Sequence, residues 1–164
     1  KASEVLFGGS LDGLSESDFA DVVAEAPGKA LDRARLATIM LGAVCHDLGK
    51  PQTTVMIDGR IKSPNHEAMG VDAATRILDR FNINTLDGFD VRTQVLGLVA
   101  HHLKPGMFHK AGNVGDGAFR RLAQKVDLEL LARVARADCH GRTGRFDCSL
   151  GRERRAPAGE TGAR

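Results

Sequence analysis

AVCHDLGKPQTT, residues 43–54, ends an apolar run with a histidine and an aspartate, followed by glycine, lysine and proline. Gly49 suits the position after a helix and the proline two residues later prevents continuation, so we predict a helix over about 31–48. His46 and Asp47 then fall in its last turn. Two metal-capable side chains at a helix end form either the polar end of a core helix or half of a metal site.

The remaining pattern predicts an all-α helical bundle with one small β-hairpin. Further helices are expected over about 15–26, 63–81, 89–103, 118–126 and 127–139. The run TTVMIDGRIKS, residues 53–63, predicts the hairpin, because two β-prone segments flank an Asp-Gly turn. Residues 104–117 are Gly-rich and resemble a loop.

The spacing of apolar residues and the residues at helix ends predict which side chains are buried and which cap the helices. The helix over 31–48 should bury an apolar stripe, and Ser63 and Pro64 should be the N-cap and first residue of the next helix. Asp127 should cap the last helix. The expected stripe comprises Leu36, Ile39, Met40, Ala43 and Val44.

Length and composition predict one ordinary globular domain over 31–147, with an appendage over 1–30 and a disordered tail over 148–164. The chain has 164 residues, of which 42% are hydrophobic and 27% charged. No apolar run nears the roughly 18–20 residues of a membrane-spanning helix, so no membrane partner is expected. Three cysteines without a CxxC pair favour reduced thiols and a cytoplasmic location. The oligomeric state stays open.

Charge is unevenly distributed along the chain. Residues 1–100 carry 10 Lys and Arg against 14 Asp and Glu, whereas residues 101–164 carry 13 against 7. A basic C-terminal half is compatible with a phosphate-bearing partner, and equally with a solvated helix face followed by a charged tail.

Polar metal-capable side chains recur at the ends of four predicted helices. They are His46, Asp47, His66, His101, His102 and Asp138. Imidazole and carboxylate donors suit a divalent ion such as Mn²⁺, Fe²⁺, Co²⁺, Ni²⁺ or Mg²⁺. Two such ions could polarise a phosphate and activate a bridging water. The alternatives are hydrogen-bonded core histidines, a helix cap at Asp47, and ion pairing of Asp138 with Arg133 or Arg142.

The segments AVCHDLGKP, IKSPNHEAMG, LGLVAHHLKPGMF and ARADCHGRTG resemble the HD superfamily of metal-dependent phosphohydrolases. They look most like the HD domain of bacterial CCA-adding enzymes, the tRNA nucleotidyltransferases, over about residues 31–147. The resemblance implies an HD-like helical bundle. It also implies phosphatase, nucleotidase or 2′,3′-cyclic phosphodiesterase chemistry on a nucleotide or an RNA 3′ end, with tRNA among the candidate partners.

The resemblance also implies metal ligands. His46, Asp47 and Asp138 would bind the metal, and His66, His101 and, as a further candidate, His102 would complete a second metal or hold the phosphate. The residue types indicate further roles. His101 or His102 would act as general acid, since imidazole titrates near neutrality. Lys50 would contact a phosphate oxygen, although a lysine there could equally be a solvated helix-end cation. Lys104, Arg142 and Arg145 would attract phosphates, or be simple surface charges.

One departure from the family pattern concerns its first metal ligand. That pattern begins with a histidine on the preceding helix, and aligning Asp32 with the family's aspartate places Ala26 there. None of the six histidines precedes His46. The departure implies weakened metal binding and impaired activity.

Residues 2–27 resemble the segment of bacterial tyrosyl-tRNA synthetases that joins the catalytic core to the C-terminal RNA-binding domain. The alternative for these residues is a generic capping helix after an exposed loop. The preferred hypothesis for the whole chain is metal-dependent phosphoester hydrolysis. The alternatives are a non-catalytic tRNA- or nucleotide-binding HD module, or a fragment of a CCA-adding enzyme involved in tRNA processing.

Overall fold

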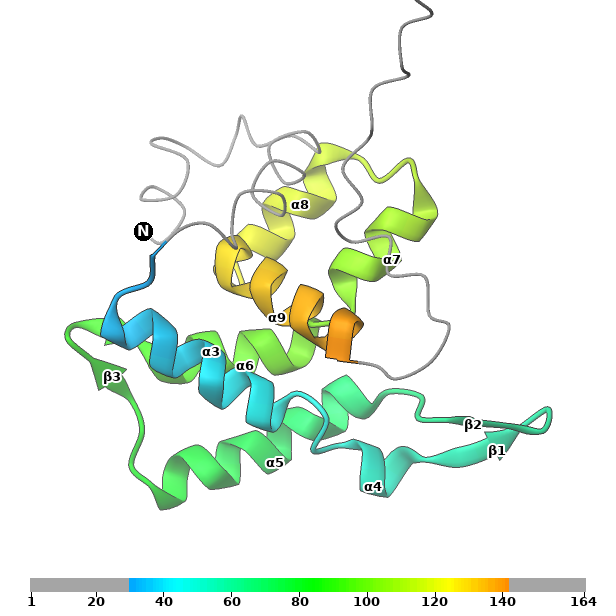
Figure 1. Cartoon of the computed structure of the whole chain (residues 1–164), viewed down its shortest axis with the longest axis horizontal. Helices are drawn as coiled ribbons and strands as arrows, with labels where there is room; N and C mark the ends of the chain where they lie inside the picture. The colour runs from blue at the N-terminus through cyan, green and yellow to red at the C-terminus, as the bar shows by residue number, and fades with distance from the viewer. Residues whose placement is uncertain (1–29, 142–164) are drawn as a thin grey trace, which may run out of the picture.

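The computed structural model describes residues 30–141, which are mostly helical and carry two small antiparallel hairpins (Figure 1). The helices are α3 (Arg33–Cys45), α4 (Lys50–Thr53), α5 (His66–Arg80), α6 (Val91–His101), α7 (Lys104–Ala111), α8 (Asp116–Ala123) and α9 (Leu128–Gly141). The hairpins pair β1 (Val55–Ile57) with β2 (Arg60–Lys62), and β3 (Thr85–Leu86) with β4 (Phe89–Asp90).

The prediction of a mostly helical chain is therefore confirmed for the part of the chain that the structure describes. The helix expected over 15–26 and the tail expected over 148–164 lie outside the described residues. The appendage expected over 1–30 also lies outside them, apart from Ala30.

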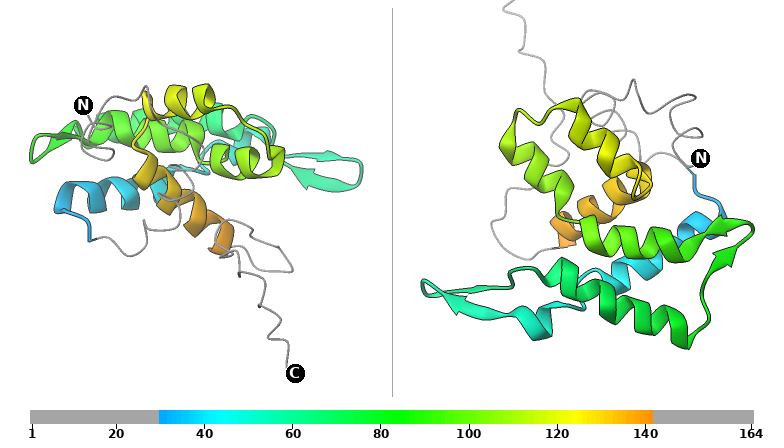
Figure 2. Two further views of the ribbon diagram at one scale, coloured as in Figure 1. Left: turned by 90° about the horizontal axis from the view of Figure 1, so that it is seen from above. Right: turned by 180° about the vertical axis from the view of Figure 1, so that it is seen from behind.

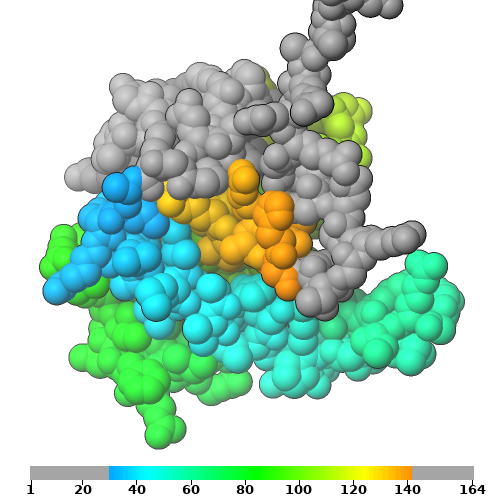
Figure 3. All heavy atoms as spheres, in the orientation of Figure 1, coloured from blue at the N-terminus to red at the C-terminus, as the bar shows by residue number. Residues whose placement is uncertain are grey.

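Helix α6 is the centre of the arrangement, because α3, α5 and α9 all pack against it. Its side chains Val95, Leu98 and Val99 are fully buried. Seen from above, α3 and α9 lie on the same side of α6 (Figure 2), and α3 also contacts α9 along the face shown in Figure 3.

Helix α3 buries mainly its small residues, which corrects most of the predicted stripe. Its buried positions are Ala34, Thr38, Gly42 and Cys45. A Cβ on Gly42 would lie 2.7 Å from Leu98 Cδ1, so the two helices approach too closely for a larger side chain.

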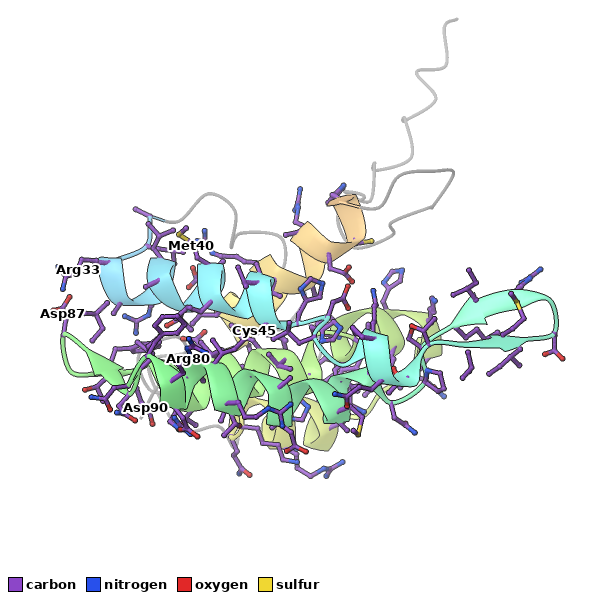
Figure 4. The ribbon with its side chains drawn as sticks, turned by 90° about the horizontal axis from the view of Figure 1, so that it is seen from below. Arg33, Met40, Cys45, Arg80, Asp87 and Asp90 are labelled. Carbon is purple, nitrogen blue, oxygen red and sulfur yellow. The ribbon has the colours of Figure 1, made fainter. Side chains whose placement is uncertain are left out.

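One member of the predicted stripe, Ile39, is partly buried and packs against the cluster of Leu98, as predicted. The other members lie on the exposed side of the helix. Leu36, Met40 and Val44 are 50%, 62% and 70% exposed, and Figure 4 shows Met40 on the outer side. Residues 36–45 contain no charged side chain. Apolar periodicity therefore could not distinguish the buried face of this helix from the exposed one.

Helices α7, α8 and α9 contribute apolar side chains to a buried cluster that also contains Leu98 of α6. Phe108 of α7 packs edge-on against Phe119 of α8, with ring centroids 5.0 Å apart. Leu122 of α8 and Leu131 of α9 join the same buried cluster as Leu98. Helix α7 corrects the prediction of a loop over 104–117, which its glycines and proline had suggested.

Both hairpins turn through an aspartate and a glycine in the left-handed region. Asp58 and Gly59 have φ of 51° and 70°, as the predicted turn requires. Asp87 and Gly88, with φ of 52° and 78°, make a second such turn that the single predicted hairpin missed. Arg33 Nε lies 3.3 Å from Asp87 Oδ2, which ties this second hairpin to the start of α3 (Figure 4).

Helix ends agree with prediction at α9 and differ at α5. The Asp127 carboxylate accepts hydrogen bonds from the backbone N–H groups of Glu129 and Leu130, as a helix cap does. Helix α5 begins at His66 after Asn65, so Ser63 and Pro64 are not its N-cap and first residue. The Ser63 hydroxyl instead lies 2.8 Å from the Thr54 hydroxyl and closes the base of the first hairpin.

Among residues 30–141, no helix combines the length and apolar character that crossing a membrane requires. Cys45 is a buried free thiol, and burial raises its pKa. Cys139 is disulfide-bonded. This bond corrects the expectation that all three cysteines are reduced.

Candidate metal centre

Five polar side chains from four separate segments meet at one end of α6. His46 and Asp47 follow the last residue of α3, and His66 is the first residue of α5. His102 directly follows α6, and Asp138 lies in the last turn of α9. The convergence that spacing alone could not establish is therefore present in the described structure.

These side chains form two overlapping groups whose donor atoms all lie within 4.8 Å of one another. The first group is Asp47, His66 and His102, and the second is His46, Asp47 and Asp138. Asp47 belongs to both. Its Oδ1 lies 3.5 Å from His66 Nε2, and its Oδ2 lies 3.3 Å from His46 Nε2.

The separations of the donor atoms fit metal coordination. Bonds to such ions are about 2.1 Å long, so two donors on one ion lie about 3.0–3.4 Å apart at octahedral to tetrahedral angles. The separation between His66 Nε2 and His102 Nε2 is 3.2 Å. His46 Nε2 and Asp138 Oδ1 are more widely spaced, at 3.7 Å. The residues present therefore fit a divalent ion without large movement.

Each of the three imidazoles is oriented by a backbone carbonyl three residues earlier. The Nδ1 atoms of His46, His66 and His102 lie 2.7, 2.7 and 2.9 Å from the carbonyl oxygens of Ala43, Ser63 and Val99. A carbonyl oxygen only accepts hydrogen bonds, so each Nδ1 must be the donor. In the neutral ring, each Nε2 then presents a lone pair toward the shared centre, as in metal-bound histidines.

The electrostatic environment differs across the centre. The facing Asp138 carboxylate raises the pKa of His46, and the nearby Asp47 adds to this effect. Burial lowers the pKa of His102, and the proximity of His46 and His66 lowers it further. His102 is therefore held neutral, which is the form that binds metals.

Close backbone packing fixes the distance between the two halves of the centre. An ideal Cβ on Gly49 would lie 2.0 Å from the carbonyl oxygen of His66 and 2.7 Å from Gly70 N. The chain after Asp47 can reach α5 this closely only without a side chain. Gly49 thus acts through contact as well as by ending a helix, and sequence reasoning recognised only the helix end.

The predicted phosphate-contacting residues are dispersed. The ammonium group of Lys50 pairs with Asp47 Oδ2, so in this structure it contacts a candidate metal ligand. Lys104 is the first residue of α7, two positions after His102. Arg142 and Arg145 lie outside the described residues.

His101, the expected metal ligand, belongs to neither group, and His102 takes that place. Successive residues on a helix point about 100° apart, so the two histidines cannot both face the centre. Within the described residues, His101 Nδ1 is buried without a hydrogen-bond partner. Burial lowers the pKa of His101, with Lys125 and Lys104 contributing.

Comparisons with known proteins add a short similarity. No protein-family model matches the chain, and no solved structure matches it. A stretch of 37 residues is 60% identical to tyrosine–tRNA ligase from Opitutus terrae, which is 23% of this chain and 9% of that protein. The match names the same class of enzyme that residues 2–27 resemble. It is too short to carry that enzyme's activity to the centre described above.

Proposed function

We propose that residues 31–147 are an HD-type, metal-dependent phosphohydrolase domain. Its substrate would be a phosphoester on a nucleotide or an RNA end, in a phosphatase, nucleotidase or 2′,3′-cyclic phosphodiesterase reaction. The observation that carries this proposal is the position of Asp47, whose two carboxylate oxygens face His66 on one side and His46 on the other. Supporting it is the run HDLGK, residues 46–50, which supplies this aspartate.

The donor set supports hydrolysis at phosphorus. Imidazole and carboxylate oxygen suit hard or borderline divalent ions, and three protein donors in each group would leave coordination positions for water and substrate. A bound divalent ion supplies Lewis-acid polarisation of a phosphoryl oxygen and a water whose pKa is lowered toward neutrality.

The chain's own residues would hold the reacting groups in place. The Ser63 and Val99 carbonyls fix the His66 and His102 rings, so these donors need little reorganisation when an ion binds. Lys104, beside the centre in sequence, would attract the negatively charged substrate. His101 belongs to neither group of donors, so its predicted role as general acid has no support from the arrangement of the centre.

The family's first histidine has no counterpart among the histidines of this chain, none of which precedes His46. The group of His46, Asp47 and Asp138 is therefore one ligand short of the family pattern. Weak turnover is the expected result.

The test is hydrolysis of bis-p-nitrophenyl phosphate and of 2′,3′-cAMP by the full chain, with Ni²⁺, Mn²⁺ or Co²⁺ added. We expect turnover that requires the ion and that Asp47→Asn abolishes, because Asp47 is shared by both groups. Asp58→Asn is the matched control, since Asp58 lies in an exposed turn and its side chain is 87% exposed. Circular dichroism confirms that both variants keep their helices.

The results separate catalysis from binding alone. Unchanged turnover in Asp47→Asn would remove Asp47 from the site. No turnover with any ion, together with tRNA binding that weakens steeply with salt, would make the chain a non-catalytic binding module.

A further inference from the structure

We propose that this centre takes a single divalent ion tightly, in the group of Asp47, His66 and His102. His46 and Asp138 would then stay outside its coordination sphere and face one another as an ion pair, with His46 Nε2 3.7 Å from Asp138 Oδ1. The inference rests on the proposed function only in assuming that the centre binds a divalent ion, and it concerns which residues bind it and how many ions are bound.

The contact between His66 and His102 favours this position of the ion most strongly. Their Nε2 atoms are 3.2 Å apart, while both Nδ1 atoms donate to carbonyl oxygens. In two neutral rings, the two Nε2 lone pairs then face one another with no hydrogen between them. A cation that binds both nitrogens removes this repulsion, and the separation already matches the spacing of about 3.0–3.4 Å on one ion.

Burial makes this arrangement costly without an ion. His66 and His102 are only 7% and 2% exposed, so water has little access to satisfy their nitrogen atoms. The third donor, Asp47 Oδ1, lies 3.5 Å from His66 Nε2 and brings a negative charge to the same point. This group therefore has both the geometry and the charge to hold an ion.

The second group is already satisfied by protein partners. His46 Nε2 faces two carboxylates, those of Asp47 and Asp138, at 3.3 and 3.7 Å. The Asp47 oxygen on this side, Oδ2, is also paired with the Lys50 ammonium. An ion here would compete with a fixed positive charge for the same oxygen. We therefore expect binding at this second position to be weak.

The experiment is a titration of the chelator-treated full chain with Co²⁺ alone, in which binding is measured by calorimetry and by visible absorption. We expect one tight site per chain. His66→Ala and His102→Gln should each weaken it by more than about 100-fold, since removing a direct ligand exceeds the 10–100-fold effect of its supporting groups. Glutamine fills most of the volume of buried His102, and circular dichroism verifies folding.

Substitutions of His46 and Asp138 in the second group should have little effect on the tight site. His46→Ala and Asp138→Ala should each change the tight affinity by less than about 10-fold. Lys50→Met should strengthen binding of a second ion, because the competing ammonium is gone. His109→Ala, which alters an exposed histidine on α7, is the matched control and should change nothing.

Two equally tight sites would overturn the inference, and so would a loss in His46→Ala as large as that in His66→Ala. Because no substrate is present, the result is independent of turnover. A chain that binds one Co²⁺ through His66 and His102 but hydrolyses nothing refutes the proposed activity and supports the inference. A chain that hydrolyses phosphoesters with two equal ions refutes only the inference, and a chain that binds no Co²⁺ refutes both.

Discussion

Gly49→Ala tests how the centre is assembled, because it adds one methyl group at the closest backbone contact in the site. Gly49 has φ of −79°, which alanine adopts freely, so the substitution introduces no backbone strain. In the absence of a clash, it should stabilise the chain by about 0.4–1 kcal/mol, since the unfolded chain loses freedom. Any loss of stability therefore measures the contact alone.

The size of the clash follows from the structure. The added Cβ would lie 2.0 Å from the His66 carbonyl oxygen, against the 3.0 Å below which real Cβ contacts essentially never fall. The start of α5 must therefore move by at least about 1 Å relative to the loop that carries Asp47. Overpacking of this kind costs typically about 1–3 kcal/mol. A displacement of 1 Å at a ligand can cost about 100-fold in function.

Urea unfolding and Co²⁺ titration measure these two effects. We expect Gly49→Ala to lower the free energy of unfolding by about 1–3 kcal/mol and to weaken Co²⁺ binding through the displaced His66. Gly106→Ala is the matched control, because nothing lies within 4 Å of a Cβ at Gly106 in α7. A Gly49→Ala chain with unchanged stability and Co²⁺ affinity would refute the role assigned to this contact.

Three further expectations concern the scaffold. Gly97→Ala should lower the free energy of unfolding by about 1–3 kcal/mol in urea, because its Cβ would lie 2.8 Å from the Lys125 carbonyl oxygen; equal stability would mean that α6 can shift. Asp127→Ala should cost about 1–2 kcal/mol in the same assay through loss of the α9 cap, and a neutral result would dismiss the cap. Burial raises the pKa of the Asp127 carboxyl group above its ordinary 3.8. The folded state therefore binds this proton more tightly than the unfolded chain, and the resulting stabilisation is full below pH 3.8 and is lost as the pH rises through the pKa of the folded state. The asparagine introduced by Asp127→Asn still accepts hydrogen bonds but does not titrate. The free energy of unfolding of this variant, relative to that of the wild type, should therefore increase as the pH rises. If the two free energies changed in parallel with pH, the raised pKa of Asp127 would be refuted.

Much of the fold could be predicted because the chain marks its turns and helix ends locally. Asp58 and Gly59 predicted the first hairpin, and Asp127 predicted the start of α9. The second Asp-Gly turn carried the same signal at Asp87, but its strands are only two residues long and showed no alternation. The pattern around Pro105 predicts a loop because proline breaks a helix interior, but this proline lies in the first turn of α7, where it is compatible with a helix.

The buried face of α3 could not be predicted for a different reason. With no charge between residues 36 and 45, every side of that segment has apolar side chains. The close approach at Gly42 decided which face is buried, and this contact depends on Leu98 of another helix. Such small-residue contacts become visible only in three dimensions.

The sequence could predict which residues form most of the candidate site, but not how their side chains are placed relative to one another. Polar residues on otherwise apolar helices singled out His46, Asp47, His66 and Asp138. Spacing could not show whether they meet, nor which of two adjacent histidines faces the centre. The supporting carbonyl oxygens and the contact at Gly49 have no signature in the sequence, because each depends on how α5 and α6 are placed.

The location of the histidines at helix ends explains how one side chain can serve both fold and chemistry. The last four carbonyl groups of a helix lack partners within it. His46 and His102 directly follow α3 and α6, and their Nδ1 atoms donate to the last-turn carbonyls of Ala43 and Val99. The same hydrogen bond that satisfies the helix end directs Nε2 toward the centre. Since helix C-termini carry partial negative charge, both ends also favour a cation at that point. A helix end followed by histidine is therefore already half of a metal site once a second such end lies beside it.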